Sequence, residues 1–255
     1  MLRTFDESRV LWRRNLIKLV RIPLLLFFSL FQPLLFLVLF SQVFNSLGQL
    51  LPAYDNYLQF LLPSIVALTA LNSAFQSGMG MVTDMEDGLL DKFLIAPIRR
   101  SSILFGKVLS DATRIMLQAL IVVLLGVLMG VRIETGVLGV GMMLLIAAAF
   151  GVAWAGLSNV VALRTGNGEL TMIIGILITF PVLFLSTSFM PAALLPDWLD
   201  TVARFNPITY VVEALRGLVN EGWVWGDIAQ AFAITAVLAL ITFTAAFRAF
   251  RAAIN

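Results

Sequence analysis

The chain has 255 residues, of which 60% are hydrophobic and 13% are charged, and its formal net charge is +2. It contains no cysteine and no histidine, which excludes disulfide bonds, thiolate chemistry, haem ligation and the usual zinc sites. A mean hydropathy of +0.97 lies far from that of soluble domains and predicts an integral membrane protein.

Residues 1–21 combine arginines with apolar side chains, among them Trp12 and Ile17, at helical spacing. This pattern predicts an N-terminal amphipathic interfacial helix whose apolar face lies at the acyl boundary. Its cationic face would then meet either anionic lipid or a soluble partner. Of the 17 basic residues, all but Arg132, Arg204 and Arg216 fall on one side of the predicted membrane. This positive-inside bias predicts that both termini are cytoplasmic.

Six charge-free stretches are candidates for transmembrane helices, because about 20 apolar helical residues cross a bilayer core. The third stretch is short, but it extends backwards through Asp111 and Arg114, which lie one helical turn apart and can pair. Backbone N–H and C=O groups in the bilayer core must form hydrogen bonds within the protein, as they do in a helix. We therefore predict an all-α integral membrane fold with six transmembrane helices. The stretches are residues 22–54, 56–83, 115–131, 135–163, 170–196 and 228–247.

The second predicted helix carries a polar stripe of Thr69, Asn72, Ser73 and Gln76, which share one helical face. In lipid, such a face must point into protein or into a water-filled path. The stripe therefore has two interpretations: it lines a transport pathway, or it supplies hydrogen bonds between packed helices.

The largest predicted cytoplasmic loop, residues 84–107, reads "DMEDGLLDKFLIAPIRRSSILFGK". We expect Gly88 to end the second helix, and a short helix with Leu89 and Phe93 on one side to stop at Pro97. Its apolar face would dock in the groove of a partner or fold back onto the membrane. The chain has no phosphate-binding loop, so energy for any transport would come from another polypeptide.

The segment 188–221 lies between two apolar stretches and contains "FMPAALLPDWLDTVARFNPITY". Two helices are expected, one with Pro196 at its first position and one capped by Asn206. They would form a re-entrant helical hairpin between spans 5 and 6 at the outer surface of the membrane. This hairpin would either gate the pathway or only hold the spans together. The residues that define this predicted outer gate are Pro191, Pro196, Trp198, Asn206, Pro207, Glu213 and Arg216. Of these, Glu213 and Arg216 lie one helical turn apart and can pair.

The loop's "EDG" and "APIRRSSILFGKVLSD", followed by "FMP…LPDWL…ARFNPITYVVEALRG", resemble type-2 ABC exporter permeases, closest to the daunorubicin-resistance-like branch. The resemblance covers essentially the whole chain and implies one transmembrane permease domain over 1–255, in the plasma membrane. It also implies no catalytic or metal site here, a separate ATPase subunit that holds ATP and Mg, and pairing with itself or a related permease. The residues that it assigns to ATPase coupling are Glu86, Asp87, Gly88, Leu89, Phe93 and Pro97.

Export of an amphiphilic or hydrophobic compound, drug-like or lipid-like, is the interpretation we favour. The mid-membrane positions offer apolar side chains with a few hydroxyl or amide groups, which suit such a cargo better than a small ion. The alternatives are export of a lipid-linked saccharide or envelope lipid, and a non-transporting membrane scaffold that recruits a cytoplasmic partner. A nucleic-acid partner is not expected, because the basic residues sort by membrane side.

Overall fold

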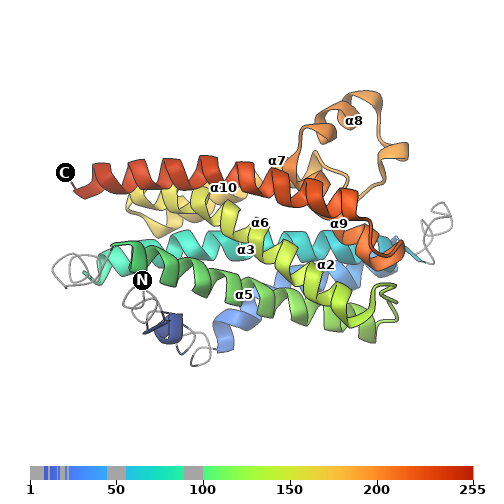
Figure 1. Cartoon of the computed structure of the whole chain (residues 1–255), viewed down its shortest axis with the longest axis horizontal. Coiled ribbons are helices and arrows are strands. Elements are labelled where there is room, and N and C mark those ends of the chain that lie inside the picture. The colour runs from blue at the N-terminus through green and yellow to red at the C-terminus, as the bar shows by residue number, and fades with distance from the viewer. Residues whose placement is uncertain are drawn as a thin grey trace.

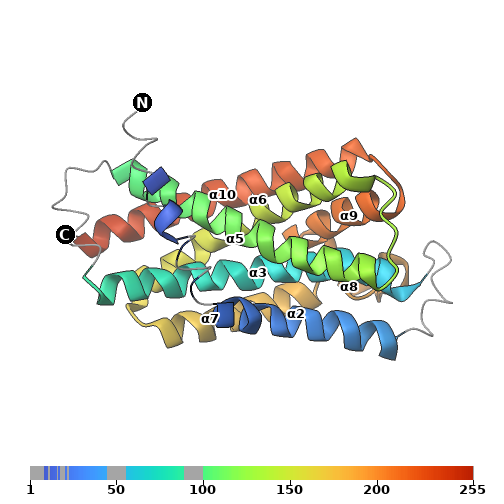
Figure 2. The same cartoon turned by 90° about the horizontal axis from the view of Figure 1, so that it is seen from below.

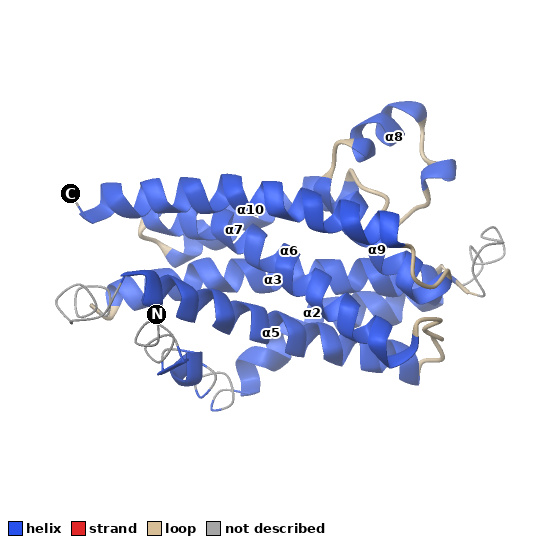
Figure 3. Cartoon of the chain, viewed as in Figure 1, coloured by secondary structure: helices blue, strands red, loops and turns tan. Residues whose placement is uncertain are grey.

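The computed structural model describes residues 9–10, 12–15, 17, 21, 23–44, 56–88 and 100–254. All regular elements in this part of the chain are helical, and most run along one common axis as an elongated bundle (Figures 1 and 3). The elements are α2 (Pro23–Val43), α3 (Tyr57–Glu86), α5 (Arg100–Leu128), α6 (Gly136–Thr165), α7 (Gly168–Phe184), η2 (Ala192–Leu194), α8 (Asp197–Arg204), α9 (Pro207–Asn220) and α10 (Trp225–Ile254).

Four of the described helices are long and apolar enough to cross a membrane. These stretches are Tyr57–Glu86, Phe105–Leu128, Gly136–Thr165 and Trp225–Ala249. Two shorter apolar helices, Ser29–Val43 and Gly168–Phe184, accompany them. The prediction of an all-helical, multi-pass membrane protein is therefore confirmed, whereas six as the number of spans stays a prediction.

The helix α3 forms the centre of the bundle and packs against α2, α5, α6, α7 and α9. Figure 2 shows it running between α5, α6 and α10 on one side and α2 and α7 on the other. Small residues allow this close approach. A Cβ added to Gly151 of α6 would lie 3.0 Å from the carbonyl oxygen of Ala70, and one added to Gly175 of α7 would overlap the ring of Phe75.

The helix α7 ends at Phe184, inside the charge-free stretch of residues 170–196 and before the predicted hairpin segment 188–221. Hydrogen bonds from outside the helix take its last free carbonyls. Asn206 Nδ2 donates to the carbonyl oxygens of Val182 and Leu185 at 2.5 and 2.9 Å, and Ser186 Oγ donates to that of Leu183 at 2.5 Å. The charge-free stretch is longer than α7 because the serines and the threonine that follow the helix carry no charge.

The two helices predicted within residues 188–221 are present as α8 and α9, but they differ in their surroundings. The helix α8 projects sideways from one end of the bundle (Figure 1), whereas α9 buries most of its side chains against α3, α6 and α10. Pro196 is the residue before α8 rather than its first helical residue, because its ψ of 147° is extended. Asn206 caps α9 as predicted, with its side chain accepting from the Ile208 N–H, and Pro207 opens that helix.

Candidate functional site

At the end of the bundle where α8 projects, Arg216 of α9 reaches into the protein and contacts α3. Its side chain is almost completely buried, and the residue is 2% exposed. The guanidinium carbon lies 3.7 Å from the centre of the Phe60 ring, and Nη2 donates to Ser64 Oγ at 3.1 Å. A buried arginine needs such partners, because an unpaired charge away from water is costly.

The same guanidinium also holds the connection between α7 and α8. Nη2 donates to the carbonyl oxygens of Thr187 at 2.6 Å and Ser188 at 3.0 Å. Nη1 pairs with Glu213 Oε1 at 2.7 Å, and that carboxylate accepts from Thr187 Oγ1 at 2.6 Å. We call Phe60, Ser64, Thr187, Ser188, Glu213 and Arg216 the Arg216 cluster, and it joins α3, α9 and the α7–α8 connection.

The predicted outer-gate residues therefore fall into two groups. Asn206, Pro207, Glu213 and Arg216 lie at the base, where side-chain hydrogen bonds fix α9 to the bundle. Pro191, Pro196 and Trp198 belong to the projecting part, where Trp198 is 64% exposed. The predicted pair of Glu213 with Arg216 is confirmed, and the gating role stays a prediction.

In the half of the bundle nearer the other end of α3, a second group of charges joins α5 to α3. Asp111 of α5 is 7% exposed and accepts from Ser77 Oγ of α3 at 2.5 Å. The same carboxylate pairs with Arg114 Nη2 at 2.9 Å and lies 3.9 Å from Lys107 Nζ. The predicted pair of Asp111 with Arg114 is confirmed, and it is part of a larger network.

Both cations of this network also bind the backbone or side chains of α3. Arg114 donates to Ser73 Oγ at 3.1 Å and to the Ser73 carbonyl oxygen at 2.8 Å. Lys107 Nζ donates to the carbonyl oxygen of Ser77 at 3.0 Å. We call Ser73, Ser77, Lys107, Asp111 and Arg114 the Asp111 cluster. Its helix-to-helix bonds were missed by sequence reasoning, because only the spacing within one helix can be read from a single sequence.

The polar stripe of α3 divides into two pairs of residues. Thr69 is buried and donates to the carbonyl oxygen of Ile65 at 2.7 Å, and Ser73 belongs to the Asp111 cluster. Asn72 and Gln76 are half-buried, and neither amide side chain has a hydrogen-bond partner among the described residues. Thr69 and Ser73 thus face protein, whereas Asn72 and Gln76 are partly exposed on the surface of α3.

Three of the six predicted coupling residues lie at the end of α3. Glu86 is its last residue, Asp87 caps it, and Gly88 follows with a φ of +60°, a conformation that favours glycine. The prediction that Gly88 ends this helix is confirmed. Leu89, Phe93 and Pro97 lie outside the described residues, so their predicted role is unchanged.

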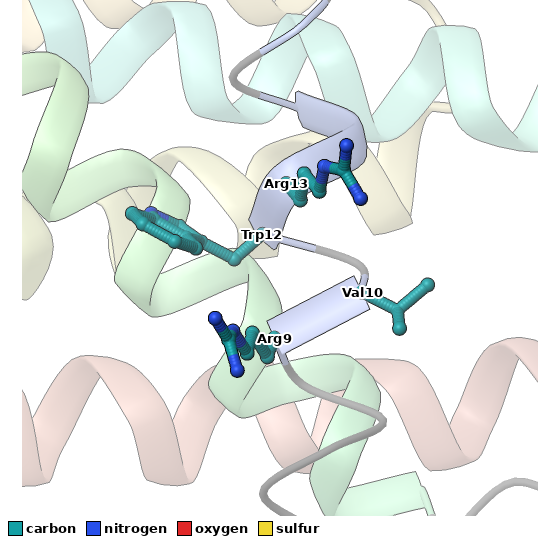
Figure 4. Close-up of a pocket in the computed structure, with 4 residues that line it drawn as sticks. All are labelled: Arg9, Val10, Trp12 and Arg13. Atoms are coloured by element: carbon teal, nitrogen blue, oxygen red, sulfur yellow. The ribbon is translucent and has the colours of Figure 1, made fainter.

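The N-terminal segment lies beside this end of α3. Arg14 Nη2 is 4.0 Å from Asp84 Oδ2, and Trp12 Nε1 donates to Thr113 Oγ1 of α5 at 3.0 Å (Figure 4). Arg14 of the N-terminal segment therefore lies close to the end of α3, where the loop predicted to contact the ATPase subunit begins.

Comparison with known proteins agrees with these features. The family model described as "ABC-2 type transporter" matches residues 7–220. The ycf38 protein of Cyanophora paradoxa, which is named as a transport permease, is 31% identical over 226 residues, covering 87% of this chain and 77% of that protein.

Two further relatives carry names that refer to drug resistance. The daunorubicin resistance ABC transporter permease protein DrrB1 of Streptomyces coeruleorubidus is 27% identical over 233 residues, covering 91% of this chain and 81% of that protein. A Mycobacterium tuberculosis permease, DrrC, named for doxorubicin resistance, is 26% identical over 191 residues, covering 74% of this chain and 68% of that protein.

Proposed function

The chain belongs to the ABC-2 type transporter family, and we propose that it carries an amphiphilic or hydrophobic compound, drug-like or lipid-like, out of the cell. As a permease of this family it is the membrane subunit of an ABC transporter and works with an ABC ATPase subunit. The proposal adds the outward direction and the class of cargo to this family assignment. The names of the relatives DrrB1 and DrrC support a drug-like cargo.

The observation that carries the proposal is the pair of half-buried amides on α3. All other positions of this helix from Tyr57 to Gly78 are buried. Asn72 and Gln76 nevertheless keep free hydrogen-bonding groups at partly open positions. In a membrane an amide of this kind is costly against lipid tails and is expected to face a polar path or a bound solute. A few amides among apolar side chains are the lining that an amphiphile needs.

The assembly that we propose follows the family. Two permeases, identical or related, would enclose the path between them in the plasma membrane, each with six spans and cytoplasmic termini. ATP-driven closure of the ATPase subunits would act on the loop after α3, through Glu86, Asp87 and Gly88 and through Leu89, Phe93 and Pro97. The α8–α9 hairpin would dip into the outer face of the membrane and cover the outer end of the path.

Reconstitution of the permease with its ATPase subunit tests this function. In vesicles with the ATPase sites outside, a fluorescent anthracycline is expected to accumulate inside when ATP is added. Vesicles with the permease alone, or with an ATPase whose hydrolytic site is disabled, are the controls and should not accumulate it.

Three outcomes of this experiment would contradict the proposal. Uphill accumulation by the permease alone would show that it does not depend on an ATPase. Movement of a lipid-linked saccharide or envelope lipid, without movement of anthracyclines or other amphiphiles, would favour that alternative cargo. Stable ATPase binding without transport of either class would favour a membrane scaffold.

Replacing both Asn72 and Gln76 by leucine is expected to change the range of transported compounds. The substitution removes the two open amides while keeping side chains of similar size, so polar amphiphiles should lose several-fold more transport than apolar ones. Relative transport rates for a graded series of amphiphiles would measure this change. The matched control is Thr69→Val, which alters a buried member of the same stripe and should leave the relative rates unchanged. A uniform loss, in parallel with lower thermal stability, would mean that the amides only pack.

A further inference from the structure

The connection between α7 and α8 is held by the bundle as far as Phe189. The carbonyl oxygen of this residue accepts from Tyr57 Oη of α3 at 3.1 Å, directly after the carbonyl oxygens that the Arg216 cluster holds. The Phe189 ring packs on Phe40 of α2 and Phe184 of α7, with ring centres 5.8 and 5.2 Å away. The backbone and the ring of this residue are therefore both fixed, and three different helices fix them.

The chain is fixed a second time at Asn206, which is buried. Its Nδ2 donates to the carbonyl oxygens of Val182 and Leu185, and its Oδ1 accepts from the Ile208 N–H at 3.0 Å. The helix α9, which begins there, buries most of its side chains. Phe189 and Asn206 both contact the end of α7, so the two fixed points belong to the same part of the bundle.

The residues between these two fixed points, 190–205, are largely open to the surroundings. Met190, directly after the first point, is 42% exposed, and Phe205, directly before the second, is 85% exposed. Ala203 is the one buried residue of α8, and none of the residues of η2 is buried. We call residues 190–205 the flap, and Figure 1 shows that it projects sideways from the bundle.

Few hydrogen bonds hold the flap to the rest of the protein. The helix α8 is stabilised from within, for example by the pair of Arg204 with Asp200 at 2.6 Å. Two hydrogen bonds join the flap to the other described residues. The Asn206 N–H donates to the carbonyl oxygen of Ala203 at 3.1 Å, and Tyr210 Oη of α9 donates to that of Arg204 at 2.6 Å. Segments with few buried contacts and few such bonds are the ones that open at low free-energy cost.

We propose that the flap swings about its two ends, at Met190–Pro191 and at Phe205, while α9 and the Arg216 cluster stay fixed to α3. Hinges of this kind are a few residues at the ends of elements that absorb the change in φ and ψ. A swing of the flap breaks the Tyr210 bond and little packing, whereas movement of the whole hairpin would also break the buried bonds of Arg216. The two interpretations of the hairpin then apply to different parts: the base holds the spans, and the flap is the part that opens and closes. Only the use of this motion as a gate rests on the proposed function.

Distances between spin labels test this motion, because the chain contains no cysteine that would have to be removed. Cysteines at Thr201 of α8 and Leu240 of α10 report the flap, and cysteines at Glu221, at the end of α9, and Leu240 report the base. All three positions are exposed. In the full-length chain with its ATPase subunit in lipid nanodiscs, dipolar spectroscopy is expected to give two populations of the Thr201–Leu240 distance. It should give one narrow population of the Glu221–Leu240 distance.

Two tyrosine variants separate the flap from its base. Tyr210→Phe removes the side-chain bond that holds the flap, so the population in which the flap has moved away should rise about fivefold, the usual effect of one hydrogen bond. The matched control is Tyr57→Phe, which removes a hydroxyl that binds the base, where the Phe189 ring is still held by its neighbours. It should leave both distance distributions unchanged.

Two outcomes would overturn the proposal. A single narrow Thr201–Leu240 population, in the wild type and in Tyr210→Phe alike, would show that the flap does not move. Two populations of the Glu221–Leu240 distance would show that α9 moves with the flap. Both distances are measured without any transported compound, so a failure of the vesicle experiment would leave this result standing.

Discussion

Replacing Arg216 by methionine is expected to lower the free energy of unfolding by about 3 kcal/mol, because it leaves buried carbonyl oxygens without their donor, whereas the Glu213 carboxylate is 42% exposed and can be hydrated. Methionine keeps much of the apolar stem but removes the donor that joins α9 to the carbonyl oxygens of Thr187 and Ser188. Those carbonyls are buried, so water does not replace the lost bonds without cost. Thermal unfolding of the purified chain in detergent would show the loss as a fall in Tm of about 10 °C.

The protein offers a matched control at the same end of the bundle. Arg204 pairs with Asp200 of α8 at 2.6 Å, a geometry close to that of Arg216 with Glu213, but the Arg204 side chain is 75% exposed. Its replacement by methionine should cost less than about 1 kcal/mol, as for other exposed ion pairs. Equal losses in the two variants would show that burial of Arg216 is not the cause. A negligible loss for Arg216→Met would mean that the Arg216 cluster does not hold the hairpin in place.

The features that could be predicted from the sequence are those that depend on a few neighbouring residues. The pairs Asp111 with Arg114 and Glu213 with Arg216 follow from three-residue spacing on a helix, and both are present. Asn206 followed by proline predicted the start of α9, because the asparagine side chain accepts from a free N–H of the first turn and proline at the first position has no N–H to leave unpaired.

The features that could not be predicted depend on packing between distant segments. Asn206 is 24 residues from Val182, yet its amide helps to end α7, so the length of the charge-free stretch does not show where that helix ends. The partners of Arg216 on α3 and of Asp111 on α3 were missed for the same reason. The polar stripe was recognised from its spacing, but only the packing of α3 shows that Thr69 and Ser73 are buried while Asn72 and Gln76 are open.

The Asp111 cluster has an electrostatic arrangement that makes one substitution unusually costly. One carboxylate faces two cations, and their side chains are 18% and 19% exposed for Arg114 and Lys107. Both cations lie against α3, so neither can leave for water without breaking its bonds to Ser73 or Ser77. Loss of the carboxylate therefore leaves two positive charges facing each other in a largely water-excluded place.

Asp111→Asn is accordingly expected to lower the free energy of unfolding by about 3 kcal/mol, a value reduced from the fully buried case because the cations are partly exposed. The matched control is Asp200→Asn, which removes a carboxylate whose partner Arg204 is 75% exposed, and it should cost less than about 1 kcal/mol.

A double-mutant cycle separates repulsion from simple loss of packing. In Asp111→Asn/Arg114→Met the carboxylate charge and one of its cations are removed together, so the double variant should lose at least about 1 kcal/mol less than the sum of the losses in the single variants Asp111→Asn and Arg114→Met. Additive losses would show that the two charges do not interact. Because the cluster joins α5 to α3 next to the predicted coupling loop, the double variant has a second expected result. Its ATPase subunit should hydrolyse ATP but drive less transport per ATP than the wild type. Of the bonds that join α5 to α3 in this cluster, those of Arg114 to Ser73 and the charge-assisted bond of Ser77 to the Asp111 carboxylate would be gone, and only that of Lys107 to the Ser77 carbonyl oxygen would remain unchanged.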